Sequence, residues 1–266
     1  MTRDNHLDRI MKALVLAAGL GERVRPLTDT IPKPMLPVGG RPLIDYPLMM
    51  LRRAGITQVI VNVHHLAGAI QKGLGRGERL GLDIVYAPEP VLLGTGGPLN
   101  AVRDYLGKDA FVIANSDGIL DLDLSTMIEF HRDRGALATL ALVKSPRTDA
   151  YIDADSRIRR MRLRRARTSG EFDDYPPALD ASIERSLASY MYCGAIVAES
   201  AMLDLIPKSP PWSLMSGLFA PMVAQALPVF GFVHDGYFRT VDDLAAYEAL
   251  RTEFESTPPR LRNLAS

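Results

Sequence analysis

The chain has 266 residues, of which 47% are apolar and 23% charged, the balance of a globular protein that buries a sizeable core. Its 31 basic and 31 acidic side chains cancel, which excludes a general electrostatic attraction to nucleic acid or to anionic membranes. No apolar run reaches the roughly 20 residues of a membrane helix, and residues 1–10 lack the apolar segment of a signal peptide, so we expect a cytoplasmic protein without membrane or nucleic-acid partners.

Short apolar runs alternate with helical patterns over the first 145 residues. Strands are predicted at residues 12–18, 57–63, 83–86, 110–115 and 137–143. Helices are predicted between them, at residues 42–54, 66–74, 97–106 and 124–134. This alternation predicts an α/β fold, with a doubly wound, mostly parallel (mixed) central sheet flanked by helices. Ligands of such sheets bind beyond the carboxyl ends of the strands.

After residue 145 the rhythm changes. We expect a hairpin near 151–160, a polar, proline-bearing stretch at 164–188, strands at 189–197 and 229–233, and helices at 215–226 and 241–254. The sequence contains no internal repeat and no linker between two separate cores. The second part is therefore expected to add strands to the same sheet and to form the other wall of a cleft.

The residues that carry chemistry lie in LAAGLGERVRPLTDTIPKPMLP, residues 16–37. A glycine-rich turn directly after a buried strand lets backbone amides approach a phosphate chain. Arg23 and Arg25 follow, and two prolines hold Lys33, which together supply a forked guanidinium and an ammonium charge. This loop suits phosphoryl or nucleotidyl transfer, where the barrier is charge repulsion and alignment. A simple tight turn explains the glycines but not the clamped Lys33.

Two other phosphate motifs fit this loop poorly. A Walker A loop ends in Gly-Lys-Ser/Thr, which is absent. A dinucleotide fingerprint needs a third glycine, but Val24 stands at that position after Gly19 and Gly21. Asn62, rather than an acidic residue, ends the second predicted strand, which further disfavours an NAD-linked oxidoreductase.

The segment AAGLGERVRPLTDTIPKPMLPVGGRPLIDY closely resembles the signature of the sugar-1-phosphate nucleotidyltransferase family, which includes mannose-1-phosphate guanylyltransferases and N-acetylmuramate-1-phosphate uridylyltransferases. The resemblance continues through LLGTGGPLNAV and IANSDG and returns weakly in GYFRTVDDLAAYEAL. It implies a Rossmann-like nucleotidyltransferase fold in one domain, residues 1–266. The nucleotide-binding half would be 12–145, the sugar-binding half 146–240 and the C-terminal helix 241–255.

The resemblance also implies roles for matching residues. Residues that would bind the nucleotide are Ala17, Ala18, Gly19, Gly21, Glu22, Glu89, Gly94 and Thr95. The backbone of 17–21 would hold base and triphosphate, while Glu89, Gly94 and Thr95 would border base and ribose. Of the implied catalytic residues, Arg23 would stabilise the departing pyrophosphate, and Lys33 the transferred α-phosphate and the incoming sugar phosphate.

The third implied catalytic residue, Asp117, would bind Mg²⁺, which proteins usually hold through one or two carboxylates plus phosphate oxygens. A turn before Gly118 is the structural alternative. Members of the family usually place a second metal-binding aspartate near the C-terminus, where direct alignment puts Thr240. Asp242 or Asp243 takes this role if the loop is shifted by two residues. Alternatively, both aspartates simply open the last helix, where acidic residues are favoured electrostatically.

The implied activity is Mg²⁺-dependent, in-line transfer of a nucleoside monophosphate from a nucleoside triphosphate to a sugar 1-phosphate. An ionised Glu89 accepts hydrogen bonds, which suits the N1–H and N2–H₂ donors of guanine and slightly favours GTP; the N3–H of uracil is an equally suitable donor, so UTP stays open. The alternative is a catalytically inactive regulatory homologue that binds nucleotide or nucleotide sugar. Thr240 supports this alternative, and the presence of Arg23, Lys33 and Asp117 together argues against it.

Three features of the second half leave alternatives open. A sugar-contacting Glu-Lys-Pro segment is missing, and residues 159–167 (RRMRLRRAR) contain six arginines in nine positions. We expect this arginine run to be solvated; a lid or groove for an acidic sugar, a phosphorylated acceptor or a partner is the alternative. Trp212 marks a substrate-facing loop or packs against the sheet. The apolar residues of the last helix pack inward or against a second subunit, so a homo-oligomer is also open.

Overall fold

The computed structural model describes residues 11–165 and 171–262. The expectations for residues 1–10, and for Ala166 and Arg167 in the arginine run, lie outside the described residues. The strands are β1 Lys12–Leu16, β2 Pro37–Val38, β3 Arg41–Pro42, β4 Gln58–Val63, β5 Asp83–Pro88, β6 Phe111–Asn115, β7 Gly118–Leu120, β8 Ala138–Val143, β9 Ala150–Ile152, β10 Ile158–Arg164, β11 Phe172–Tyr175, β12 Ala188–Ala198, β13 Val229–His234 and β14 Phe238–Thr240.

The α-helices are α1 Asp45–Arg53, α2 Ala67–Leu74, α3 Pro98–Leu106, α4 Leu124–Asp133, α5 Ala181–Ser186, α6 Ala220–Ala224 and α7 Leu244–Ser256. Short 3-10 helices occupy Glu22–Val24, Leu27–Asp29, Lys33–Met35, Glu78–Leu80 and Ser200–Leu205, and a π-helical turn at Met215–Phe219 precedes α6. None of the helices in the described ranges has the length and apolar character needed to cross a bilayer.

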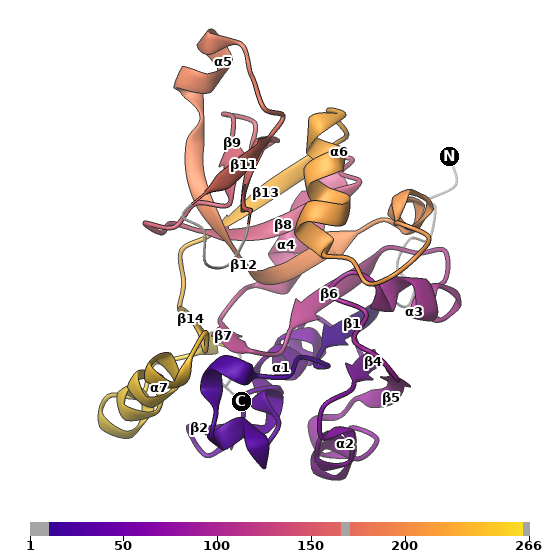
Figure 1. Cartoon of the computed structure of the whole chain (residues 1–266), viewed down its shortest axis with the longest axis vertical. Coiled ribbons are helices and arrows are strands. Elements are labelled where there is room, and N and C mark those ends of the chain that lie inside the picture. Colours follow the sequence, from indigo (N-terminus) through magenta and orange to yellow (C-terminus); the bar gives the residue numbers. More distant parts are fainter. Residues whose placement is uncertain (1–10, 166–170, 263–266) are drawn as a thin grey trace, which may run out of the picture.

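The described residues form a ten-stranded mixed sheet (Figure 1). Strands β5, β4, β1 and β6 pair in parallel, β12 runs antiparallel to β6 and to β8, and β13 is parallel to β8. The antiparallel strands β9, β10 and β11 extend the sheet from the start of β12. The predicted α/β class with a mixed, mostly parallel sheet is confirmed.

Alternate residues of the parallel strands enter different cores, because successive side chains point to opposite faces of a sheet. In β1, Ala13 and Val15 belong to one apolar cluster, with α1, α2 and α4, and Leu14 belongs to the other, with α3 and α6. Both clusters also take residues from β12, so residues from both halves of the chain build each core. The sheet is thus covered on both faces, and its strand ends are free to form a site.

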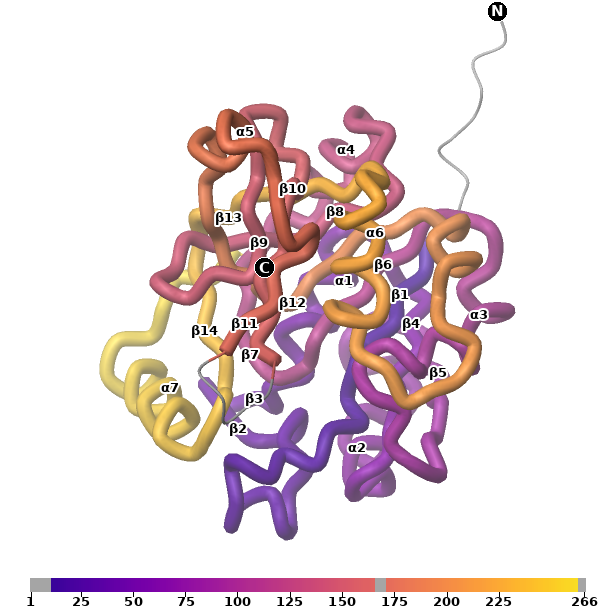
Figure 2. Tube along the Cα trace, turned by 45° about the horizontal axis from the view of Figure 1, so that its top comes forward, coloured from indigo at the N-terminus to yellow at the C-terminus, as the bar shows by residue number. Residues whose placement is uncertain are grey.

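Helix α7 packs against the segment that follows the glycine-rich loop. Tyr247, Leu250 and Phe254 are buried in a third cluster with residues of the loop and of β2, and the two segments lie together in both views (Figures 1 and 2). The Tyr247 hydroxyl donates to the Pro37 carbonyl at 3.0 Å. The apolar residues of the last helix therefore pack inward, which was one of the two predicted alternatives.

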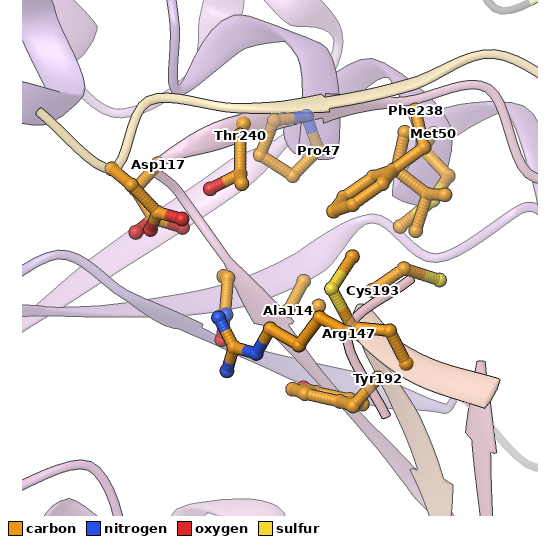
Figure 3. A pocket seen from close by; sticks show the side chains of 15 residues that line it. Pro47, Met50, Ala114, Asp117, Arg147, Tyr192, Cys193, Phe238 and Thr240 are labelled. Carbon is orange, nitrogen blue, oxygen red and sulfur yellow. The ribbon is translucent and has the colours of Figure 1, made fainter. Parts of the chain in front are cut away.

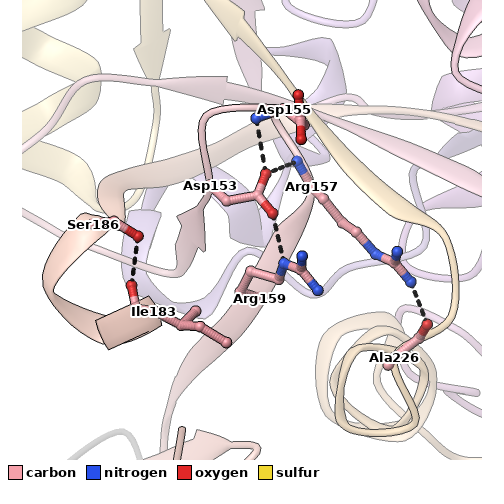
Figure 4. A network of polar contacts seen from close by, with 7 residues as sticks. All are labelled: Asp153, Asp155, Arg157, Arg159, Ile183, Ser186 and Ala226. Atoms are coloured by element: carbon pink, nitrogen blue, oxygen red, sulfur yellow. Dashed lines mark hydrogen bonds and ion pairs between the residues drawn. The ribbon is translucent and has the colours of Figure 1, made fainter. Parts of the chain in front are cut away.

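The arginine run differs from its prediction. Residues 158–164 form β10, where Arg162 donates to both oxygens of Asp174 at 2.8 Å, and Arg159 Nε donates to Asp153 at 2.6 Å (Figure 4). Arg160 is buried and contacts Glu184. The prediction of a solvated run is thus wrong for Arg160, whereas Arg159 and Arg162 are paired but remain partly exposed. Antiparallel pairing with β11 aligns Arg162 with Asp174, so cross-strand carboxylates neutralise the arginines.

Candidate active site

A cavity of about 470 Å³ opens at the carboxyl ends of β1, β4 and β6. Residues 16–24 line it, together with Lys33, Pro34, Asn62, Leu92, Gly94, Thr95, Asn115, Ser116, Asp117 and Asp242. All predicted nucleotide-binding residues except Glu89 line this cavity, as do Arg23, Lys33 and Asp117. The parallel register explains why distant segments meet here, because Leu16 pairs with both Asn62 and Asn115.

The glycine-rich loop is held from below and open toward the cavity. The Ala17 amide donates to the Asn62 side-chain oxygen at 2.7 Å, and the Thr28 hydroxyl donates to the Gly21 carbonyl at 2.9 Å. Gly21 has a φ of +66°, and a Cβ there would lie 2.8 Å from Thr28 Cγ2, so the position requires glycine. A Cβ on Gly19 would meet nothing within 4 Å. The backbone at Gly19 therefore has room for a bound phosphate chain.

Two cations face this space with different surroundings. Lys33 is only 12% exposed, and its Nζ lies 2.8 Å from Asp117 Oδ2. Arg23 is half exposed, with Nη2 3.7 Å from Asp242 Oδ1. Arg25, in contrast, pairs with Asp29 and is not a lining residue of the cavity. Lys33 and Arg23 thus each contact a different carboxylate of the same site, and both can also bind phosphate oxygens.

Pairing of β7 with β14 brings the two aspartates into one site. Thr240 aligns with Gly118, and the Val241 amide donates to the Asp117 carbonyl at 2.9 Å. The next residue, Asp242, then lines the same cavity as Asp117. Asp243 instead caps α7, accepting from the Ala246 amide at 2.8 Å. Each of the two predicted roles is therefore found, in neighbouring residues: Asp242 lies in the site, and Asp243 opens the last helix.

Glu89 lies behind the cavity wall. It is buried, and its two carboxylate oxygens accept from the Asn62 side-chain amide at 2.7 Å and from the Leu93 amide at 3.1 Å. His64 Nδ1 lies 2.7 Å from the Glu89 carbonyl. Glu89 therefore fixes Asn62, which in turn holds the Ala17 amide. Its side chain supports the glycine-rich loop from behind.

The loop carrying Gly94 and Thr95 is packed against Trp212, which is buried. The Gly96 amide donates to the Trp212 carbonyl at 2.9 Å, and the Thr95 hydroxyl accepts from the Leu214 amide at 3.0 Å. Gly94 has a φ of +78°, and a Cβ there would lie 2.4 Å from the Trp212 carbonyl oxygen. Of the two interpretations of Trp212, the structure supports packing: it anchors this wall of the cavity.

A second, smaller cavity of about 140 Å³ adjoins the first (Figure 3). Asn115, Asp117 and Asp242 line both cavities. The remaining walls are largely apolar, from residues such as Pro47, Met50, Leu120, Met191 and Phe238. Arg147 and Tyr192, from the second half of the chain, add polar groups. The two aspartates therefore stand at the junction of a larger and a smaller compartment.

The lining residues that were not predicted as site residues include Asn62, Asn115, Ser116, Arg147 and Tyr192. The first three had a usable signal, because each ends, or directly follows, an apolar strand at the sheet edge where ligands bind. Arg147 and Tyr192 had no such signal, since only the folded chain brings their segments to this edge.

No cluster of three or more His, Cys, Asp or Glu side chains that could hold a metal occurs within the described ranges. Asp117 and Asp242 are the acidic side chains that border both cavities. Two carboxylates at the junction of two cavities match the way Mg²⁺ is bound with substrate oxygens completing its shell. The residues present therefore fit such an ion.

Comparisons with known proteins agree with this geometry. The family described as "Nucleotidyl transferase" matches residues 12–162. UTP–glucose-1-phosphate uridylyltransferase from Synechocystis sp. is 32% identical over 87% of this chain and 60% of its own length. N-acetylmuramate alpha-1-phosphate uridylyltransferase from Neisseria meningitidis is 43% identical over 45% of this chain and 52% of its own length. The chain thus spans between half and two thirds of these relatives.

Solved structures show the same fold. A putative glucose-1-phosphate thymidylyltransferase from Bacillus anthracis superimposes with a TM-score of 0.71, covering 92% of this chain and 96% of that one. Its sequence is 19% identical, so the similarity concerns the fold alone.

Proposed function

The chain belongs to the nucleotidyl transferase family, and from its site we propose that it transfers a nucleoside monophosphate from a nucleoside triphosphate to a sugar 1-phosphate. The observation that carries this proposal is the meeting of two cavities at Asp117 and Asp242. The larger one has the open glycine-rich backbone and the two cations that a triphosphate needs. The smaller one offers a compartment for the sugar.

The reaction follows from this arrangement. A phosphate oxygen of the sugar 1-phosphate attacks the α-phosphorus of the triphosphate, a new P–O bond forms, and the bond to the β-phosphate breaks to release pyrophosphate. Lys33, at the junction, offsets charge on the α-phosphate and the incoming phosphate, and Arg23 does so on the departing pyrophosphate. The attacking oxygen is already anionic, so no side-chain nucleophile is needed.

We further propose that Asp117 and Asp242 hold Mg²⁺. When bound, the ion supplies positive charge to the phosphate oxygens. Lys33 contacts Asp117 at 2.8 Å, so this lysine also offsets the negative charge of that carboxylate. The inactive regulatory alternative depended on Thr240 standing where a second aspartate is usual. With Asp242 lining both cavities, that reason is removed and we do not propose it.

The base is guanine or uracil in this proposal. The Synechocystis relative is named for UTP, and the resemblance of the sequence extends to guanylyltransferases. Guanine was favoured because Glu89 accepts hydrogen bonds, but both Glu89 oxygens are already engaged by Asn62 and Leu93. Glu89 therefore does not decide between the two, and selection falls to the residues that line the cavity.

A pyrophosphate-exchange experiment tests the mechanism. Direct attack predicts that labelled pyrophosphate enters the triphosphate only when the NDP-sugar or sugar 1-phosphate is present. Exchange with nucleotide and Mg²⁺ alone would indicate a covalent nucleotidyl-enzyme and would contradict direct attack. Lys33→Ala should abolish the sugar-dependent exchange, whereas Arg251→Gln, which removes an exposed cation of α7 that lines neither cavity, serves as the control for loss of a cation.

A further inference from the structure

Two side chains that line the smaller cavity have donor atoms without a partner among the described residues. The Tyr192 hydroxyl is buried without a hydrogen-bond partner among the described residues, although it lines the cavity. Within the same part of the chain, the Arg147 guanidinium contacts Asp149 through Nε, which leaves Nη1 and Nη2 available. Figure 3 shows both side chains on the same wall, beneath Asp117 and Thr240. A buried donor without a partner is costly, so the Tyr192 hydroxyl indicates an acceptor supplied by a ligand, and the exposed Arg147 guanidinium beside it can bind the same acceptor.

The Asp149 carboxylate contacts both residues, the Arg147 side chain and the Tyr192 backbone. Asp149 Oδ1 accepts from Arg147 Nε at 3.2 Å, and Oδ2 accepts from the Tyr192 amide at 3.3 Å. The Asp149 backbone is held as well, because its amide donates to the Tyr190 carbonyl at 2.8 Å and its carbonyl accepts from the Arg162 amide at 2.9 Å. Arg147 is therefore held through Nε, and no residue in the described part of the chain contacts its terminal nitrogens, which suits binding of a planar anion in a fork.

Neither donor is needed for the phosphate in the proposed reaction. Lys33 and Arg23 already stand beside the two aspartates at the junction. Burial raises the pKa of the Tyr192 hydroxyl well above its ordinary value, so it stays protonated and donates. A guanidinium and a neutral hydroxyl together match a carboxylate, which accepts from both, better than a sugar hydroxyl, which gains little from a cation.

We propose that the acceptor is an acidic sugar 1-phosphate, whose carboxylate binds Arg147 and Tyr192. This inference rests on the proposed function and names the substrate class of the same site. The carboxylate belongs either to the sugar ring, as in a uronic acid, or to an ether substituent, as in a lactyl sugar. Both sources present the same chemistry to Arg147.

Two matched pairs of acceptors test this proposal. Glucuronic acid 1-phosphate and glucose 1-phosphate differ by a ring carboxylate, and N-acetylmuramic acid 1-phosphate and N-acetylglucosamine 1-phosphate differ by a lactyl ether. We expect kcat/KM to favour the acidic member of one pair by about tenfold or more. The pair that shows the preference identifies the source of the carboxylate.

Variants of Arg147 and Tyr192 then test whether these side chains cause the preference for the acidic acceptor. Arg147→Gln should bring the acidic-to-neutral ratio close to one, and Tyr192→Phe should lower it by about threefold. Arg251→Gln, which removes another half-exposed arginine with one carboxylate partner, should leave the ratio unchanged. An equal loss on acidic and neutral acceptors in Arg147→Gln would place Arg147 on the 1-phosphate and overturn the proposal. A ratio near one in both pairs would do the same.

Calorimetric binding of the four sugar phosphates separates this proposal from the proposed function. Tighter binding of an acidic acceptor that depends on Arg147, without turnover with any nucleotide, would retain the acidic-sugar inference and contradict the transferase. Turnover on neutral acceptors with equal binding of both members would retain the transferase and contradict the inference.

Discussion

Asp242 and Asp243 are neighbours in sequence with separable roles, and replacing each by alanine should affect different properties. Asp242→Ala removes a carboxylate that lines both cavities. Its ion pair with Arg23 joins two half-exposed groups at 3.7 Å, so the free energy of unfolding should change by less than about 1 kcal/mol. Because the carboxylate would help to hold Mg²⁺, kcat should fall by roughly 100-fold or more.

Asp243→Ala should show the opposite pattern. It removes the cap that accepts from the Ala246 amide at 2.8 Å, which costs about 1 kcal/mol of unfolding free energy. For a chain of this size the melting temperature should drop by about 2–4 °C. Most of the turnover should remain, since Tyr247 and Phe254 still hold α7 against the loop.

Thermal unfolding and pyrophosphate release, measured on both variants across a Mg²⁺ titration, check this pair. The Asp242→Ala protein should also need more Mg²⁺ for its residual turnover. An inactive Asp243→Ala protein beside a fully active Asp242→Ala protein would refute the assignment and move the second carboxylate by one residue.

Three further predictions follow from the packing and charges. Gly94→Ala should raise KM for the nucleotide by about tenfold, because its Cβ would lie 2.4 Å from the Trp212 carbonyl; Gly107→Ala, with a similar φ but open space, is the control in steady-state kinetics. Phe254→Ala should lower the urea-derived free energy of unfolding by about 3 kcal/mol, since its ring packs edge-on against Tyr46 and Tyr237; an unchanged midpoint would contradict the inward packing of α7. Burial lowers the pKa of both His131 and His234 below the ordinary value of 6.5. For His131, the negative charge of Glu199 partly opposes this shift and the positive charge of Arg132 adds to it. The unfolded chain therefore takes up protons first, and stability should fall as the pH drops below about 6.5; His131→Gln should reduce this slope in urea titrations at several pH values.

Local patterns were sufficient to predict the parallel core. The runs that became β1, β4 and β6 are largely apolar, and a glycine follows within two residues of the end of each intervening helix. Because parallel strands align their carboxyl ends, the sequence predicts the glycine-rich loop and Asp117 at one edge of the sheet. The structure places both there.

Contacts between distant segments were not predictable in the same way. Strands β7 and β14 have three residues each, too short to show a period, and yet their pairing brings Asp242 to Asp117. The arginines of β10 looked solvated because their partners in β11 and α5 lie in a stretch without a clear strand or helix pattern. Glu89 was predicted to border the nucleotide base, because the sequence does not show which way a buried carboxylate points. In the fold this carboxylate points to Asn62.

The proposed transfer reaction is best tested by measuring pyrophosphate release by the purified protein with Mg²⁺, across the four nucleoside triphosphates and a panel of neutral and acidic sugar 1-phosphates. We predict that one nucleotide–sugar pair yields equal amounts of pyrophosphate and NDP-sugar, and that Lys33→Ala and Asp117→Ala both lose this turnover. Nucleotide binding without product from any pair, in protein shown to be folded, would contradict it.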